Sequence, residues 1–211
     1  IKRSKPMDTS TGLNFTALRE VNYMLGLQCP YIVALVDVFL TGDSLHMVME
    51  YCPFDLKDVI YDKKIFLTEA HIKSYMKMLL QGLEACHENF ILHRDLKPAN
   101  VLVGLDGKLK LADFGYARSF SSPREMTSKV VTLAYRPPEL LFEAIFYGAA
   151  VDMWAVGCMF AEFMLRHPLF PGTSELDQLA KIFNIMGTPT EANWPNCGLL
   201  PSFVDFEQRA P

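Results

Sequence analysis

The hydrophobic pattern of the chain changes at Pro53, and this change strongly constrains the fold. Before Pro53, short segments rich in β-branched or alternating apolar residues are typical of strands, with one helical segment among them. After Pro53, apolar residues recur at three- and four-residue steps, which is typical of helices that bury one face. The sequence therefore predicts an α+β fold with a small strand-containing lobe at residues 1–51 and a larger, mainly helical lobe at residues 52–211. A ligand cleft is expected between two such lobes.

The expected elements of the first lobe are one helix and two strands. Residues 14–25 carry apolar side chains near helical spacing, with Asn14 and Thr16 as the two candidate helix caps. Residues 31–40 are rich in Val, Ile and Phe, which predicts a strand. Residues 44–51 alternate in polarity and predict a second strand, with a turn at residues 42–43 between the two.

The second lobe is expected to contain several helices and two short strands. Thr68 is a candidate cap for a long helix. One buried stripe is predicted on that helix, formed by Ile72, Tyr75, Met76, Leu79, Leu80 and Leu83. Residues 153–165 are apolar on nearly every face and predict a central buried helix, and Ser174 is a candidate cap for another. Residues 101–103 and 109–111 predict the two strands.

Composition limits the classes of function. Of the 211 residues, 50% are apolar and 21% charged, which is typical of a globular protein and not of a disordered one. The net charge of −4 gives no basic field for nucleic acid, so no direct nucleic-acid partner is expected. The most apolar stretch, residues 149–165, is too short and too charged to span a bilayer, so no membrane role is expected.

The cysteines indicate a reducing compartment. They are odd in number and contain no C-x-x-C pair: Cys29, Cys52, Cys86, Cys158 and Cys197. This pattern favours free thiols in a cytosolic or nuclear protein over a disulfide framework.

Two motifs carry the chemistry. Residues 93–100 read His-Arg-Asp-Leu-Lys-Pro-Ala-Asn, and Asp-Phe-Gly follows at residues 113–115, with its aspartate 18 residues after Asp95. This pair resembles the catalytic loop and the metal-binding motif of protein kinases. Phosphoryl transfer requires a carboxylate beside the attacking hydroxyl and cations on the transferring charge. Asp95 is therefore expected to accept the hydroxyl proton, and Lys97 to lie near the γ-phosphate of ATP as a point charge.

Four further positions complete the expected nucleotide and metal site. Asn100 and Asp113 supply hard oxygen ligands that suit two Mg²⁺ ions. Ile1-Lys2 resembles the end of the kinase strand that carries the phosphate-binding lysine, and Glu20 lies in the first predicted helix. A Lys2–Glu20 pair of this kind positions the α- and β-phosphates. Taken alone, each would be read as a solvated surface residue, and the downstream motifs favour the pair.

The resemblance narrows to the cyclin-dependent kinases. Residues 14–20 (Asn-Phe-Thr-Ala-Leu-Arg-Glu) look like the cyclin-binding helix of that family, and residues 187–195 are similar to the stretch after its G helix. Similarity to the subfamily that activates other cyclin-dependent kinases and serves transcription factor IIH is carried by residues 119–123, 138–142, 151–158 and 176–179. The resemblance covers essentially the whole chain. It implies a bilobal kinase fold truncated at both ends, without the Gly-rich loop and the last helices.

The resemblance also implies an adenosine site. Glu50 and Cys52 belong to the hinge segment whose backbone pairs with adenine, after Met49 as gatekeeper. Asp55 is expected to reach the ribose, and Leu102 to form the floor under adenine. Met49 and Leu102 fit a plain core role equally well.

Regulatory positions are implied in the same way. Thr127 matches the activating phosphothreonine of the family, and Ser122 matches a second, proline-directed phosphosite, although a bland polar turn is equally consistent there. Thr132 matches a catalytic position of the activation segment. The expected phosphate clamp consists of Arg19, Arg94 and Arg118. Several bidentate donors are what a doubly charged phosphate needs to order a loop.

A proline-directed specificity is expected from two further matches. Val131 and Arg136 match positions that shape a pocket for proline after the phosphoacceptor, with Arg136 donating a hydrogen bond to the Val131 carbonyl. Ala134 and Pro137 depart from the family, which has a tryptophan and an alanine at these positions, so a looser pocket is expected.

The sequence thus predicts an ATP- and Mg²⁺-dependent Ser/Thr kinase that needs a cyclin. By resemblance, the cyclin is expected to be similar to cyclin H, with a RING-finger assembly factor and transcription factor IIH as further partners. Expected substrates are the RNA polymerase II C-terminal repeat and the activation loops of other cyclin-dependent kinases, in the nucleus and also the cytoplasm. The alternative is a truncated, non-catalytic cyclin-binding or scaffold form of such a kinase.

Overall fold

The computed structural model describes residues 1–4, 14–122 and 124–210. The chain forms two compact units, residues 1–121 and residues 122–211, and each is described by itself. The lobe boundary expected after residue 51 falls within the first unit and stays a prediction.

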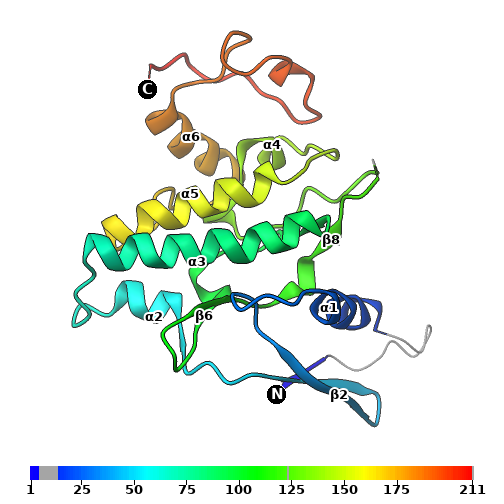
Figure 1. Ribbon diagram of the computed structural model, residues 1–211. Coiled ribbons are helices and arrows are strands. Elements are labelled where there is room, and N and C mark those ends of the chain that lie inside the picture. The colour runs from blue at the N-terminus through cyan, green and yellow to red at the C-terminus, as the bar shows by residue number, and fades with distance from the viewer. Residues whose placement is uncertain (5–13, 123, 211) are drawn as a thin grey trace. The chain divides into compact units, whose positions relative to one another are not determined.

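The first unit begins with a three-stranded antiparallel sheet. Strand β3 (Ser44–Met49) lies in the middle, between β1 (Lys2–Arg3) and β2 (Leu35–Thr41). Strands β2 and β3 form a hairpin in which Gly42 has a φ of 56°, a left-handed conformation that glycine adopts without steric cost. The helix beside this hairpin in Figure 1 is α1 (Phe15–Gly26), which contacts β2.

Helix α1 confirms the first predicted helix. Its N-cap is Asn14, whose side chain accepts a hydrogen bond from the Ala17 backbone N–H at 3.0 Å. One face of the helix is buried through Ala17, Glu20 and Met24. A carboxylate on the buried face of a helix requires a partner, and this partner belongs to the site described below.

The strand predicted over residues 31–40 is shorter than expected, because β2 begins only at Leu35. The preceding residues pair with other parts of the unit. Val33 N–H donates to the Leu111 carbonyl at 2.9 Å, and Leu111 N–H donates to the Tyr31 carbonyl at 2.8 Å. Segment 31–34 is therefore a connector between the sheet and a distant strand, and its β-branched residues serve that pairing.

The remaining elements of the first unit are two helices and several short strands. Strands β4 (Phe54–Asp55), β6 (Val101–Val103) and β7 (Leu109–Leu111) form a second antiparallel sheet, with β6 in the middle. The predicted strands at residues 101–103 and 109–111 are thus confirmed. Strand β5 (Ile91–Leu92) pairs with β8 (Arg118–Ser119), and the helices are α2 (Leu56–Tyr61) and α3 (Glu69–Glu88).

Helix α3 starts as the sequence indicated but buries a different stripe. Thr68 caps it in a reciprocal arrangement with His71. Leu79 and Leu83 are buried as predicted, whereas Leu80 is 40% exposed, which makes its prediction as a core residue wrong. The buried face continues instead through Gly82 and Cys86, which sequence hydrophobicity did not single out.

The second unit consists of short helices around a mixed aromatic and aliphatic core. Its elements are η3 (Leu133–Tyr135), α4 (Pro138–Leu141), α5 (Ala150–Leu165), α6 (Glu175–Met186) and η4 (Cys197–Leu199). Phe142 is fully buried, and its ring centroid lies 5.0 Å from that of Phe203 and 6.3 Å from that of Phe183. Ser174 caps α6 by accepting a hydrogen bond from the Asp177 N–H, as predicted.

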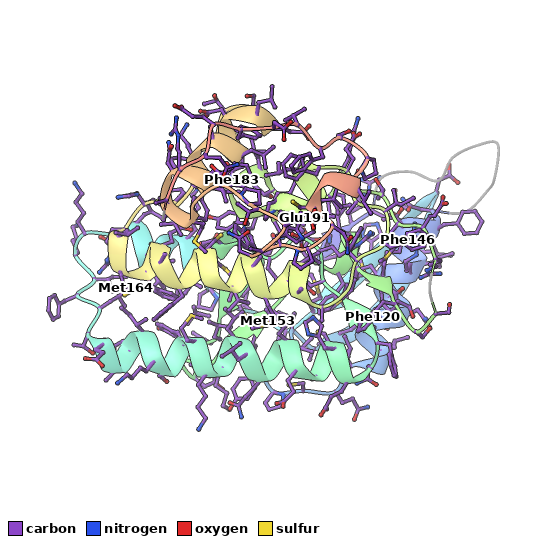
Figure 2. The ribbon with its side chains drawn as sticks, turned by 90° about the horizontal axis from the view of Figure 1, so that it is seen from above. Phe120, Phe146, Met153, Met164, Phe183 and Glu191 are labelled. Atoms are coloured by element: carbon purple, nitrogen blue, oxygen red, sulfur yellow. The ribbon has the colours of Figure 1, made fainter. Side chains whose placement is uncertain are left out.

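Helix α5 is not buried on all sides, contrary to the expectation. Met153 and Met164, which lie towards opposite ends of the helix in Figure 2, are both exposed. Glu162 is fully buried instead and accepts a hydrogen bond from the Tyr135 hydroxyl at 2.8 Å. A buried carboxylate with a donor explains why an acidic residue is tolerated inside an apolar helix.

Three global features follow from the described residues. All five cysteines are free thiols, as predicted, and burial raises the pKa of Cys158 to about 12. Within residues 1–4, 14–122 and 124–210, no helix is long and apolar enough to cross a bilayer. The same part of the chain holds no group of three or more His, Cys, Asp or Glu residues arranged to bind a metal ion.

Candidate active site

The residues of the predicted catalytic loop meet in one hydrogen-bonded cluster. Asp95 and Lys97 lie between β5 and the short helix η1 (Pro98–Asn100), and Asn100 ends that helix. Lys97 Nζ lies 2.7 Å from Asp95 Oδ2. Asn100 Nδ2 donates to the same oxygen at 2.9 Å and to the Asp95 backbone carbonyl at 2.8 Å. The Asp95 carboxylate is buried, and these donors hold it in one orientation.

His93 supports this loop through hydrogen bonds at both of its ring nitrogens. Its Nε2 lies 2.9 Å from the Ala112 carbonyl oxygen, and its Nδ1 accepts a hydrogen bond from the Asp95 N–H at 3.3 Å. This pattern assigns the imidazole proton to Nε2, since a carbonyl can only accept. The ring also packs against Phe114 at a centroid distance of 5.0 Å. His93 thereby links the catalytic loop to the Asp-Phe-Gly motif.

A second cluster joins three segments that are far apart in the sequence. Lys2 on β1 donates to Glu20 Oε1 on α1 at 2.6 Å and to Asp113 Oδ1 at 2.6 Å. The predicted Lys2–Glu20 pair is therefore present. Asp113 lies between β7 and the short helix η2 (Phe114–Tyr116) and has a φ of 63°, a conformation that non-glycine residues rarely adopt. Such strained backbone is concentrated at functional sites.

The electrostatics of this cluster favour the charged forms of Lys2 and Asp113. Burial by itself would lower the pKa of Lys2, but hydrogen bonds to Asp113 and Glu20 outweigh it and raise this pKa. Burial would raise the pKa of Asp113, but the hydrogen bond from Lys2 outweighs it and lowers this pKa. The Gly115 N–H also donates to the Asp113 carboxylate. The lowered pKa keeps the Asp113 carboxylate ionised at neutral pH, the form in which a carboxylate can bind a metal ion.

The donor set around Asp95 and Asp113 suits a divalent hard cation. The Asp113 carboxylate and the amide oxygen of Asn100 are ligands of the type that Mg²⁺ prefers. Since Asn100 Nδ2 is committed to Asp95, the amide oxygen is the atom that can act as a ligand. Two protein ligands are few, which fits a metal ion that keeps waters and binds through substrate phosphates.

The residues expected around adenosine occupy the end of β3, the segment that follows it and strand β6. Met49 ends β3, and Asp55 pairs with Leu102 in the β4–β6 register. The Asp55 carboxylate caps α2 by accepting a hydrogen bond from the Asp58 N–H at 2.8 Å. Burial raises the pKa of the Cys52 thiol, with a further contribution from Glu50. The ligand roles of these positions stay predictions.

The structure adds a contact at Glu50, in the expected hinge segment, that sequence reasoning missed. Glu50 Oε2 forms an ion pair with Lys110 Nζ at 2.9 Å, and Glu50 Oε1 accepts a hydrogen bond from the Ala34 N–H at 2.7 Å. The side chains of Glu50 and Lys110 are both mostly shielded from water. The sequence indicated only that Lys110 lies between two leucines of a buried strand. The local pattern could not identify the carboxylate that pairs with it.

The expected regulatory residues divide between the two units. Arg94 is buried, has a φ of 64° and donates from Nε to the Tyr116 carbonyl at 2.8 Å. Arg118 lies on β8, and Arg19 lies on α1. Thr127, Ser122 and Thr132 belong to the second unit and are exposed, and Pro123 lies outside the described residues. The proposed roles of all six residues stay predictions.

The hydrogen bond expected between Arg136 and Val131 is present in the second unit. Arg136 Nε and Nη2 both donate to the Val131 carbonyl oxygen, at 3.2 Å and 3.0 Å. Val131 has a φ of 65°, which turns its carbonyl into this interaction.

The family model of the protein kinase domain matches residues 1–205. The chain belongs to the protein kinase family. A curated relative of this kinase chain is cyclin-dependent kinase 7 of Dictyostelium discoideum, which is 52% identical over 199 residues, or 94% of this chain and 55% of the relative. The chain therefore spans little more than half the length of this relative.

Solved structures give the same relationship. The kinase chain resembles a chain of the CAK complex from Chaetomium thermophilum bound to ATP-gamma-S, with a TM-score of 0.92 and 45% identity, covering 98% of this chain and 66% of that one. It also resembles a chain of the yeast RNA Pol II CTD kinase CTDK-1 complex, with a TM-score of 0.89 and 37% identity, covering 94% and 66%. The predicted kinase fold and the resemblance to cyclin-dependent kinases are confirmed.

Proposed function

We propose that the protein containing this chain is a cyclin-dependent Ser/Thr kinase that transfers the γ-phosphate of ATP. The observation that carries the proposal is the pair of clusters in the first unit, Asp95–Lys97–Asn100 and Lys2–Glu20–Asp113. Each places a carboxylate against a lysine at 2.6–2.7 Å, in the roles that phosphoryl transfer requires.

The residues divide the work. The oriented Asp95 carboxylate accepts the proton of the substrate hydroxyl. The positive charge of Lys97 stabilises the negative charge of the γ-phosphate beside it. Lys2, fixed by Glu20, orients the α- and β-phosphates. Asp113 and Asn100 would hold Mg²⁺, which would neutralise charge on the transferring phosphoryl group.

Partners and substrates follow from the relatives. Association with a cyclin similar to cyclin H is supported by the cyclin-dependent kinase and CAK similarities. The similarity to a kinase of the RNA polymerase II C-terminal domain supports Ser-Pro repeats as substrates and a nuclear location. Activation loops of other cyclin-dependent kinases, a RING-finger assembly factor, transcription factor IIH and a cytoplasmic pool belong to the same proposal. Phosphate on Thr127, clamped by Arg19, Arg94 and Arg118, would order the activation segment.

Replacement of Asp113 by Asn tests the proposal. The full-length protein, purified with its cyclin, is assayed for transfer of radiolabelled phosphate to a Ser-Pro peptide. Asp113→Asn should lower kcat by roughly two orders of magnitude or more, since a metal ion contributes several kcal/mol of charge stabilisation and this change removes a charged ligand.

Asp106→Asn is the matched control. Asp106 lies in the exposed turn between β6 and β7, where its carboxylate pairs with Lys108. Removing the charge of Asp106 should therefore leave kcat unchanged. Near-normal turnover by Asp113→Asn would contradict the proposed role. Absence of phosphate transfer by the wild-type complex would favour the non-catalytic scaffold alternative.

A further inference from the structure

The backbone at Val131 is held in an unfavourable conformation. Its φ of 65° lies in the left-handed region, which β-branched residues avoid because of steric clashes. Val131 is buried, so its carbonyl oxygen needs a partner inside the protein. Arg136 provides two donors to that oxygen, at 3.2 Å and 3.0 Å.

The same guanidinium group is anchored on its other side. Arg136 Nη1 donates to Glu175 Oε1 at 2.6 Å. The Arg136 side chain is 14% exposed and that of Glu175 is 50% exposed. A guanidinium is planar and rigid, so fixing its third nitrogen fixes the plane in which the other two donate.

Glu175 is a firm anchor because of its place in α6. It is the first residue of the helix, directly after the N-cap Ser174. A negative charge in the first turn is stabilised by the helix dipole. The other carboxylate of this turn, Asp177, accepts hydrogen bonds from the Thr173 N–H at 2.8 Å and the Thr173 hydroxyl at 3.1 Å, so it bonds to the preceding loop rather than to Arg136.

We infer that Glu175 is a positioning residue for proline selectivity, acting through Arg136 on the Val131 carbonyl. The inference rests on the proposed kinase function and adds a residue to it. With the Val131 oxygen committed to Arg136, it cannot accept a hydrogen bond from the backbone N–H of a residue after the phosphoacceptor. Proline has no N–H and loses nothing, whereas other residues leave a donor unsatisfied. Without Glu175 the guanidinium can turn, and the oxygen becomes available to non-proline peptides.

The test is the ratio of kcat/KM for paired Ser-Pro and Ser-Ala peptides, measured with the full-length protein in complex with its cyclin. Glu175→Gln should lower this ratio by roughly two- to fivefold, the effect expected for a partly exposed ion pair. Asp177→Asn is the matched control, because it removes another carboxylate from the same helical turn without touching Arg136. It should leave the ratio unchanged.

A double-mutant cycle separates positioning from a general structural effect. Arg136→Lys removes the planar fork and should lower the ratio by itself. Adding Glu175→Gln to Arg136→Lys should then change the ratio little, because both act on one interaction. Fully additive effects would overturn the inference, since independent contributions mean that Glu175 does not act through Arg136.

The experiment distinguishes failure of the proposed role of Glu175 from failure of the proposed kinase function. If the wild-type ratio is well above one and Glu175→Gln leaves it unchanged, the role of Glu175 is wrong and the kinase proposal stands. If the wild-type complex transfers no phosphate to either peptide, the kinase proposal is wrong and the role of Glu175 falls with it.

Discussion

Single residues in the first unit show how one cation can organise a site. The Lys2 ammonium group serves two carboxylates, Glu20 on α1 and Asp113 after β7, both at 2.6 Å. Glu20 is almost fully buried, and Lys2 provides a cation directly beside its carboxylate. Removing the lysine would leave a buried carboxylate without its cation, which costs more than the ion pair itself is worth.

Lys2→Met should therefore lower the free energy of unfolding by about 1–2 kcal/mol at neutral pH, a modest value because Lys2 is partly open to water. The pKa of Lys2 is raised, so its stabilisation is present below the ordinary value of 10.5 and is lost as the pH rises through the folded-state value. The pKa of Asp113 is lowered, so its stabilisation is present above the ordinary value of 3.8 and is lost as the pH falls through the folded-state value.

The difference between wild type and Lys2→Met should thus be widest between about pH 5 and pH 10, measured by urea unfolding across the range. Lys108→Met is the control, since Lys108 pairs with Asp106 in an exposed turn and its removal should not be detectable. A difference that stays constant from acid to alkaline pH would show that Lys2 stabilises the protein by packing and not by charge.

At the scale of elements, the joint between α3 and segment 31–34 depends on one glycine. A Cβ atom added at Gly82 would lie 2.7 Å from the Tyr31 carbonyl oxygen and 3.2 Å from a Leu111 methyl carbon. The Tyr31 carbonyl accepts the Leu111 N–H, so it cannot move away without breaking a strand contact. The helix can approach this segment only because the side chain is absent.

Gly82→Ala should destabilise the protein by about 1–3 kcal/mol, the usual cost of overpacking, although alanine is the better helix former by about 1 kcal/mol. Gly157→Ala in α5 is the matched control, since among the described residues no atom beyond its chain neighbours and the helix's own backbone lies within 4 Å of the added Cβ. It should raise stability by about 0.5–1 kcal/mol. The stability of both variants is measured by thermal unfolding. A Gly82→Ala variant more stable than wild type would contradict the close contact between α3 and segment 31–34.

At the scale of the molecule, one apolar surface remains uncovered in the first unit. On α1, Phe15, Leu18 and Leu25 are exposed, on the side away from the buried Ala17, Glu20 and Met24. Leu18 and Leu25 are seven residues apart, two helical turns, and so lie on one face. On the contacting strand β2, Val36 and Leu40 are also exposed. Exposed apolar residues on a helix and on the strand that it contacts suit an interaction surface, which supports the proposed cyclin partner.

Leu25→Glu should weaken binding of a cyclin similar to cyclin H by about tenfold or more, because burying a leucine contributes about 1.5–3 kcal/mol. Leu25 is 62% exposed, so the free protein should keep its stability. Leu105→Glu, in the exposed turn between β6 and β7, is the control and should bind as wild type does. Unchanged affinity of Leu25→Glu, measured by isothermal titration with the full-length protein, would rule out this face as the cyclin site.

The sequence by itself determined the features that depend on neighbours along the chain. The helix caps Asn14, Thr68 and Ser174 were predictable, because a cap bonds to a residue three positions away. The Arg136–Val131 hydrogen bond was expected from the resemblance to cyclin-dependent kinases and not from local spacing. The catalytic and Asp-Phe-Gly motifs were recognisable because phosphoryl transfer permits few residue types at these positions.

Only the tertiary structure decided which distant residues meet. The Lys110–Glu50 pair, the Arg136–Glu175 pair and the approach of Tyr31 to Gly82 join segments 39 to 60 residues apart, and no local pattern names such partners. Burial was also decided by the tertiary structure. Leu80 and Met153 are as apolar as their buried neighbours, yet both are exposed. Periodicity shows that a helix has an apolar face, but what covers that face is set by the chain that folds against it.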